Sequence, residues 1–135
     1  MTKKVTRPKP EGIFSRNFDG KPLYSQVVGV EGARMVFVSG QIARDAEGKL
    51  IGKGDMRAQI IGVAENIERC LEAAGAGMQD IVKMIAYVTD IDEYSKHVDL
   101  RARYFAAAAP ASATVEVSRL AGPDYMVEIE VVAAI

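Results

Sequence analysis

The stretch of sequence that decides the fold is PASATVEVSRLAGPDYMVEIEVVAA, residues 110–134. It contains two runs of alternating apolar and polar side chains, 115–118 and 127–131, and the turn sequence Ala-Gly-Pro-Asp separates them at 121–124. Alternation with a period of two places the two sets of side chains on opposite faces of a sheet. We therefore predict two strands joined by a turn as a hairpin, with apolar residues on one face and glutamates on the other.

Three glutamates, Glu116, Glu128 and Glu130, fall on these two strands. Like charges on neighbouring strands repel one another, so this arrangement does not serve stability alone. Either the carboxylates spread into solvent, or one of them lines a site. The register of the strands is not fixed by the sequence, and a slip of one residue would turn Glu128 to the opposite face.

The composition limits the class of protein. The chain has 135 residues, 49% of them hydrophobic, which corresponds to one domain with its own core. A formal net charge of -1 argues against a nucleic-acid-binding protein, and no apolar run is long enough to span a membrane. One cysteine, Cys70, fits a cytoplasmic protein, and with one histidine, His97, it cannot form a zinc site within one chain. We expect no metal site.

The first part of the chain is predicted as an irregular segment, 1–21, followed by a domain at 22–135. Two apolar runs flanking a Glu-Gly turn predict a hairpin over residues 24–39. Gly40, at the end of this hairpin, indicates a β-bulge or a close approach of another backbone segment. We expect a further short edge strand near residues 50–51.

The middle of the chain predicts two helices with a strand between them. Apolar residues at helical spacing predict a helix over 55–74 with Asp55 as its N-cap, and a second helix over 90–107. Residues 80–90 are apolar at nearly every position and read as a strand. This order predicts an α+β two-layer sandwich of a mixed sheet with two helices on one face. The strand at residues 80–90 is too apolar for the helix-free face of the sheet to be solvated there, and burial of that face by another subunit favours an oligomer.

Several short motifs, in this order and spacing, resemble the Rid family, the reactive-intermediate imine and enamine deaminases that are also called YjgF-like. The resemblance covers residues 22–134. The motifs that carry it are Tyr24-Ser25-Gln26, Ser39-Gly40-Gln41, Asp80-Ile81-Val82-Lys83, Pro110-Ala111 followed by Val115-Glu116-Val117, and Val127-Glu128-Ile129-Glu130.

The resemblance implies a homotrimer whose sheets pack around a three-fold axis, with small-molecule ligand clefts between neighbouring subunits. It also implies an activity, the hydrolysis of 2-imino or 2-amino-enoic acids to 2-oxo acids and ammonia without a cofactor. In the family, an arginine binds the substrate carboxylate and a glutamate holds the attacking water. By position, Glu128 matches that glutamate, Tyr24 matches a cleft tyrosine, and Ser39 matches a serine of the cleft.

One part of the family pattern differs in this chain. The family sequence Pro-Ala-Arg-Ser-Cys reads Pro-Ala-Ser-Ala-Thr at residues 110–114, so that Ser112 stands in the place of the arginine and Thr114 in the place of the cysteine. A guanidinium binds a carboxylate through two charge-assisted hydrogen bonds that a serine cannot supply. Either another cation takes over, with Arg101 or Arg103 nearest, or the ligand has no carboxylate there and binds the hydroxyls of Ser112 and Thr114.

Two functions follow as alternatives. The first is a trimeric hydrolase of a small imine or enamine in which Glu128 orders the water as general base and then general acid. The second is a non-catalytic protein of the same fold that binds a small molecule or regulates a partner. Ribonuclease activity, reported for parts of the family, has no support from the charge of this chain.

Overall fold

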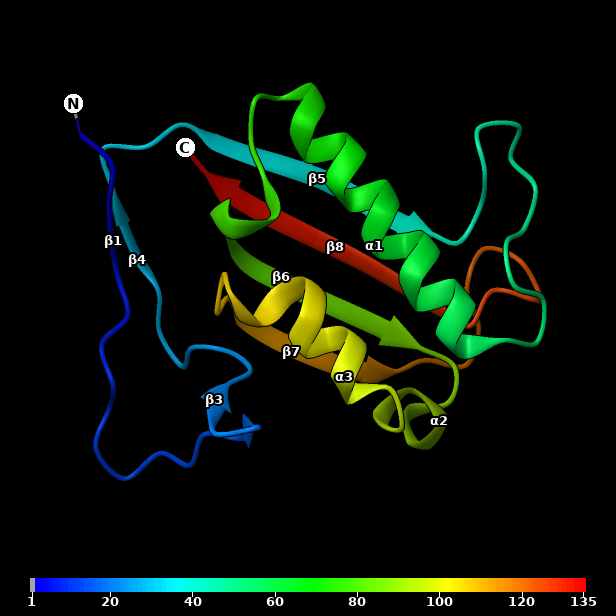
Figure 1. The fold of residues 1–135 in the computed structure, drawn as a ribbon, viewed down its shortest axis with the longest axis horizontal. Helices are drawn as coiled ribbons and strands as arrows, with labels where there is room; N and C mark the ends of the chain where they lie inside the picture. The colour runs from blue at the N-terminus through cyan, green and yellow to red at the C-terminus, as the bar shows by residue number, and fades with distance from the viewer. Residues whose placement is uncertain (1) are drawn as a thin grey trace.

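The computed structural model describes residues 2–135, and a four-stranded sheet forms its centre (Figure 1). The strand order is β5 (Met35–Ile42), β8 (Val127–Ala134), β6 (Ile81–Val88) and β7 (Ala111–Glu116). β8 is antiparallel to both of its neighbours, whereas β6 and β7 are parallel. The helices α1 (Met56–Ala73), α2 (Ile91–Ser95) and α3 (Val98–Arg101) lie on one face of this sheet. The predicted α+β architecture with a mixed sheet is confirmed.

The predicted hairpin at residues 110–134 is wrong, because β6 lies between β7 and β8. A parallel pair needs a crossover connection, and the helical segment between β6 and β7 supplies it. β7 therefore joins the free edge of β6, while β8 occupies the other edge. Glu116 is thus separated from Glu128 by a strand, and its Oε1 accepts a hydrogen bond from the Ile91 backbone N–H at 3.1 Å.

The predicted hairpin at 24–39 is also wrong. β5 pairs with β8, and the preceding strand β4 (Gly29–Glu31) pairs with β1 (Lys4–Thr6) in a separate ladder. The segment 1–21, predicted to be irregular, therefore contains β1 and also β2 (Asn17–Phe18), which pairs with β3 (Lys21–Pro22). The expected edge strand near 50–51 is reduced to one isolated bridge between Arg44 and Leu50.

The core lies between α1 and the sheet. The Asp55 side chain caps α1 by accepting a hydrogen bond from the Ala58 N–H at 3.0 Å, as predicted. Ile60, Ile67 and Leu71 of α1 are buried in the same cluster as the inward-facing apolar residues of β8. No helix within residues 2–135 is both long and apolar enough to cross a bilayer.

The predicted second helix, 90–107, is divided into three parts. α2 begins at the N-cap Asp90 and ends at Ser95, α3 follows at Val98–Arg101, and a π-helical turn covers Ala102–Ala106. π-helical turns are rare and often occur at functional sites, because they shift the side chains that precede them. Here the turn begins directly after Arg101.

The opposite face of the sheet carries an exposed apolar patch with carboxylates beside it. Phe37 of β5 is 77% exposed, and Met35 and Val115 are exposed as well. Phe37 lies opposite Val132 in the β5–β8 register, on the face that also carries Glu128 and Glu130. We call this surface the outer face. Its exposed apolar side chains are what the prediction of an oligomer requires.

Candidate functional site

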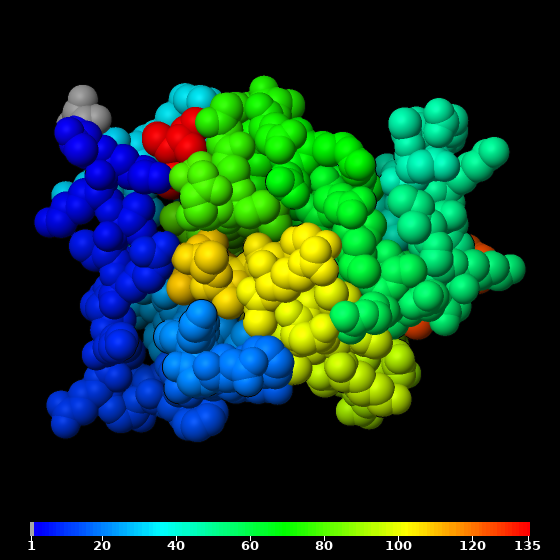
Figure 2. All heavy atoms as spheres, in the orientation of Figure 1, coloured from blue at the N-terminus to red at the C-terminus, as the bar shows by residue number. Residues whose placement is uncertain are grey.

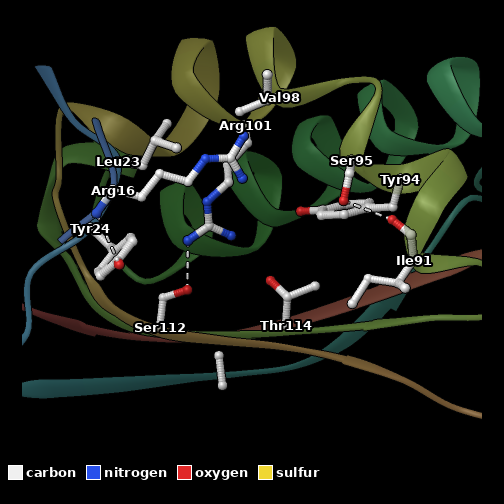
Figure 3. Close-up of a pocket in the computed structure, with 11 residues that line it drawn as sticks. Arg16, Leu23, Tyr24, Ile91, Tyr94, Ser95, Val98, Arg101, Ser112 and Thr114 are labelled. Carbon is white, nitrogen blue, oxygen red and sulfur yellow. Dashed lines mark hydrogen bonds between the residues drawn. The ribbon is translucent and has the colours of Figure 1, made fainter. Parts of the chain in front are cut away.

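A cavity of about 260 Å³ lies between the β7 edge of the sheet, the α2–α3 segment and the N-terminal segment (Figure 3). Figure 2 shows residues near 20 packed directly against the α3 region, which closes this side of the cavity. We call it the arginine pocket, because its only charged lining residues are two arginines. Its lining consists of Arg16, Leu23, Tyr24, Ile91, Tyr94, Ser95, Val98, Arg101, Ser112, Ala113 and Thr114.

Arg101 is the central charged group of the arginine pocket. Its residue is only 9% exposed, and its Nη2 donates a hydrogen bond to the Ser112 Oγ at 2.6 Å. Its Nη1 is buried and has no hydrogen-bond partner among residues 2–135. Buried polar groups are almost always paired, because an unmade hydrogen bond costs about 1–3 kcal/mol and more for a charged group. The Arg101 guanidinium therefore keeps hydrogen-bonding capacity that residues 2–135 do not use.

Ser112 and Thr114 form the sheet side of the pocket. In the parallel β6–β7 register, Ser112 lies opposite Met84 and Thr114 opposite Ala86, and both of these β6 residues are fully buried beneath the helices. The two hydroxyl side chains consequently share one face and point into the pocket (Figure 3). Their shared face is what the spacing of two residues on one strand predicts, and their role toward a ligand stays a prediction.

Tyr24 is held beside the start of β7 by its neighbour. The Ser25 Oγ donates to the Ala109 carbonyl at 2.5 Å, and the Ser25 N–H donates to the Pro110 carbonyl at 3.0 Å. The Tyr24 hydroxyl accepts a hydrogen bond from the Arg16 backbone N–H at 3.1 Å. The hydroxyl proton remains available for another acceptor, since a phenol both accepts and donates.

Arg16 is a pocket residue that the sequence analysis missed. The Asp19-Gly20 pair, with φ of 50° and 72°, forms the tight turn between β2 and β3. This hairpin brings Arg16 opposite Leu23, whose N–H donates to the Arg16 carbonyl at 3.4 Å. An Asp-Gly pair is a strong hairpin signal, so the turn was detectable in the sequence. The Arg16 side chain points into the pocket beside Arg101 (Figure 3).

Glu128 and Ser39 do not lie in the arginine pocket of the same chain. Both belong to the outer face, on the other side of the sheet from Arg101 and Thr114. The Glu128 carboxylate lies so close over Gly40 that a Cβ at position 40 would overlap its Oε2. A β-bulge interrupts the β5–β8 register at this point. Of the two alternatives for Gly40, the irregularity in the ladder is present, and the group that approaches Gly40 closely is a side-chain carboxylate and not a backbone.

The residues around Glu128 form a hydrogen-bonded group on the outer face. Tyr87 lies opposite Glu128 in the β6–β8 register, and its hydroxyl donates to the Glu130 Oε1. The hydrogen bond to the Glu130 carboxylate raises the pKa of Tyr87 above its ordinary value, because it stabilises the protonated phenol. The Glu130 carboxylate is thereby hydrogen-bonded to Tyr87, whereas the Glu128 carboxylate lies over the backbone of Gly40.

The structure distinguishes between the two arginines that were candidates for carboxylate binding. Arg103 is exposed, and its guanidinium lies 5.3 Å from the centroid of the Tyr104 ring. It does not line the pocket, whereas Arg101 does. No cluster of His, Cys, Asp or Glu suited to a metal ion occurs in the part of the chain that the structure describes.

The sequence profile of the family described as Endoribonuclease L-PSP matches residues 16–135. A RutC family protein of Pyrococcus horikoshii is 39% identical over 125 residues, which are 91% of this chain and 96% of that protein. Protein DfrA of Myxococcus xanthus is 38% identical over 97 residues, which are 72% of this chain and 74% of that protein.

Solved structures show the same similarity. A protein of the conserved Rid family from Yersinia pestis has a TM-score of 0.80 at 28% identity, with all of both chains covered. A member of the YjgF/YER057c/UK114 family from Mycobacterium tuberculosis has a TM-score of 0.66 at 31% identity, covering 83% of this chain and 86% of that one. The sequence matches and the shared fold together show that this chain belongs to the Rid family, which is also named YjgF, RutC and L-PSP.

Proposed function

We propose that this Rid-family protein is a hydrolase that deaminates a small imine or enamine carrying a carboxylate. The observation that carries the proposal is the state of Arg101: a buried guanidinium, fixed by Ser112, with an unpaired Nη1 in a pocket without acidic residues. A ligand carboxylate would supply the missing acceptor. Arg101 would thus perform, from α3, the task that the family pattern gives to an arginine at the position of Ser112.

The proposed chemistry is the addition of water to a C=N bond. Glu128 takes a proton from the water while the oxygen attacks the imine carbon, and the imine nitrogen gains a proton. The resulting carbinolamine then loses its nitrogen as ammonia, and the C=O bond of a 2-oxo acid forms. A single carboxylate can serve both proton transfers, first as base and then as acid. No cofactor takes part in this sequence.

The proposal includes a homotrimer, because one chain does not bring Glu128 and Arg101 together. In the trimer, the outer face of one subunit would lie against the arginine pocket of the next, so that Glu128 and Ser39 complete a cleft between subunits. The exposed Phe37 and Met35, farther along β5 on the same face, supply apolar area for such a contact. The clefts would hold the small-molecule ligand.

The second candidate is a non-catalytic ligand-binding or regulatory protein of the same fold. It is favoured by the placement of Glu128 and Arg101 on opposite faces of the sheet in the single chain. If the subunits assemble otherwise, the arginine pocket still binds a carboxylate but has no base beside it. The two candidates therefore differ in catalysis and not in binding.

An imine-hydrolysis assay separates the two candidates. An amino-acid oxidase generates 2-imino acids, and semicarbazide competes with the protein for them, so hydrolysis by the protein appears as slower formation of semicarbazone. The hydrolase proposal predicts slower semicarbazone formation with the protein than in buffer, and Glu128→Gln should abolish this difference. Glu130→Gln, two residues away on the same face, is the matched control and should retain activity, because an amide oxygen still accepts from Tyr87. No acceleration for a range of amino acids would refute the hydrolase and leave the binding protein.

A further inference from the structure

We infer that the arginine pocket selects ligands with two carboxylates, namely 2-imino dicarboxylic acids and the corresponding 2-oxo dicarboxylic acids. Arg101 binds the carboxylate next to the reacting carbon, and Arg16 binds the second one. This inference rests on the proposed function for the identity of the first carboxylate. The inference of a second carboxylate depends on Arg16 alone, a residue outside the motifs that indicated the family.

Arg16 is positioned by defined contacts. Its backbone is fixed on one side by the Tyr24 hydroxyl and on the other by the β2–β3 hairpin that begins at the next residue. Tyr24 in turn is tied to the start of β7 through the two hydrogen bonds of Ser25. The N-terminal segment thus delivers a guanidinium to the same cavity that Arg101 enters from α3 (Figure 3).

The charge of the pocket is uncompensated. The ion pairs among residues 2–135 join Lys3 to Asp80, Arg57 to Asp99, and Glu93 to Lys96 and His97, so they involve neither pocket arginine. Two guanidinium groups that share one cavity repel each other, and although Arg16 is exposed to solvent, Arg101 is buried. A ligand with two negative charges neutralises both, whereas a monocarboxylate leaves Arg16 unpaired.

The size and lining of the cavity favour a dicarboxylate of a few carbons. A cavity of about 260 Å³ lies just below the roughly 300–1,000 Å³ of pockets for drug-sized ligands. Besides the arginines it offers hydroxyls of Ser95, Ser112 and Thr114, and no charged group that would repel an anion. A planar guanidinium pairs with a carboxylate through two parallel hydrogen bonds, so two arginines provide two carboxylate subsites.

Calorimetric binding of two 2-oxo acids of equal chain length tests this inference. The full-length protein should bind 2-oxopentanedioate about tenfold or more tightly than 2-oxopentanoate, because only the former reaches Arg16. Arg16→Gln should remove this preference, because the affinity for 2-oxopentanedioate should fall much more than the affinity for 2-oxopentanoate. Arg44→Gln, which removes an exposed arginine outside the pocket, is the matched control and should leave the preference intact.

Two results would overturn the inference. One is equal affinity of the wild-type protein for the two acids. The other is inorganic phosphate binding more tightly than either acid in an Arg16-dependent manner, which would mean that both arginines converge on one dianionic group. An unchanged urea unfolding midpoint for Arg16→Gln would show that the fold is retained in the variant.

The outcomes also separate this inference from the proposed function. Hydrolysis of monocarboxylic imino acids without any preference for dicarboxylic ones would refute the inference and leave the hydrolase. Arg16-dependent binding of 2-oxopentanedioate without any imine hydrolysis would refute the hydrolase and leave the dicarboxylate site. Each proposal can therefore fail alone.

Discussion

The Arg101 guanidinium donates a hydrogen bond to the Ser112 hydroxyl, with 2.6 Å between Nη2 and Oγ. The donor comes from the end of α3 and the acceptor from β7, so the contact fixes a helix side chain on the sheet edge. We propose that this guanidinium takes the role that the family resemblance led us to expect of an arginine at the position of Ser112. The serine here occupies little space, and the guanidinium of Arg101 lies over it. The two residues together would do what one residue does in the pattern.

Removing the Ser112 hydroxyl should weaken carboxylate binding without abolishing it. In Ser112→Ala the guanidinium keeps its charge but loses the group that orients it, and of the roughly 1.5–3 kcal/mol that a hydrogen bond of a charged group is worth, only the part that orients Arg101 affects ligand binding. We expect the affinity for a 2-oxo acid to fall roughly threefold to tenfold. Calorimetry measures the change, and Thr114→Ala tests whether the adjacent hydroxyl contributes independently. An affinity equal to the wild type in Ser112→Ala would show that the contact does not position Arg101.

Exchanging the two residues should restore what either single change removes. Ser112→Arg alone adds a further guanidinium directly against Arg101 and should lower stability through repulsion. Arg101→Ser alone leaves Arg16 as the remaining cation of the pocket and should weaken binding of a 2-oxo monocarboxylic acid by about tenfold or more. The double variant Arg101→Ser with Ser112→Arg returns one guanidinium to the pocket, and we expect binding within about tenfold of the wild type. Binding that stays lost in the double variant would contradict the equivalence of the two positions.

Gly40 should be necessary for activity through Glu128. A Cβ in Gly40→Ala overlaps the Glu128 Oε2 and displaces the carboxylate, which is the flexible end of a side chain, so the fold should tolerate the change. We expect imine hydrolysis to fall by about tenfold or more, because general acid–base groups contribute roughly 10²–10⁴. Binding of 2-oxo acids should be retained.

Gly62→Ala is the matched control for this substitution. At Gly62 on α1 the nearest atoms to an added Cβ lie at 3.6 Å, which is ordinary contact. Alanine also favours a helix over glycine by up to about 1 kcal/mol. Activity should therefore be unchanged in Gly62→Ala. If Gly62→Ala lost activity as Gly40→Ala does, the loss in Gly40→Ala could not be assigned to displacement of the Glu128 carboxylate.

Gln59 should be the most sensitive polar residue of the core. Its Nε2 donates to the carbonyls of Gly52 and Asp124 at 3.1 and 2.9 Å, and its Oε1 accepts from the Met126 N–H at 2.8 Å. Gln59→Leu fills the space but leaves these three backbone groups unpaired, and we expect a loss of about 2–4 kcal/mol in the free energy of unfolding. Urea denaturation measures it. The exposed Gln79→Leu should change stability by at most about 0.5 kcal/mol, and an equal loss in both variants would contradict the role of Gln59.

The Arg57–Asp99 pair should stabilise the protein only above acidic pH. The two side chains join α1 to α3 through two hydrogen bonds of 3.1 and 2.7 Å, and these lower the pKa of Asp99 below its ordinary value. A carboxylate with a lowered folded-state pKa contributes stability above the unfolded-state pKa of about 3.9, and the contribution is lost as the pH falls through the folded-state value.

The difference in urea midpoint between the wild type and Asp99→Asn should therefore be small and positive at pH 7. It should vanish at a pH well below 4, and Arg57→Gln should show the same dependence. A difference that persists in acid would mean that Asp99 acts through something other than its charge.

The sequence predicts where the helices and strands of this fold lie better than it predicts which strands are adjacent in the sheet. Helical periodicity located α1 and its cap Asp55, and an apolar run located β6. Period-two alternation says which face a side chain occupies but not which strand lies alongside. β7 and β8 are close in sequence and were therefore paired, although the parallel crossover places β6 between them.

The candidate site was predicted only in part, because local patterns in the sequence identify single residues but not which of them lie together. Family motifs led to Tyr24, Ser112 and Thr114, and charge complementarity led to Arg101, all of which the structure brings into one pocket. Arg16 was missed, because residues 1–21 were treated as a solvated tail and the Asp-Gly turn within them was passed over. The separation of Glu128 from Arg101 depends on register and on assembly, and neither is encoded in a local pattern.

The kcat/KM for 2-imino acid hydrolysis by Arg101→Gln tests the central claim most directly. The substitution removes both charge-assisted donors, each worth about 1.5–3 kcal/mol, and kcat/KM should fall roughly a hundredfold to ten-thousandfold. Arg103→Gln, two residues along the chain and outside the pocket, should retain the wild-type value. Arg101→Lys should be intermediate, since it keeps the charge without the planar fork. A wild-type kcat/KM in a folded Arg101→Gln protein would contradict the assignment of carboxylate binding to Arg101.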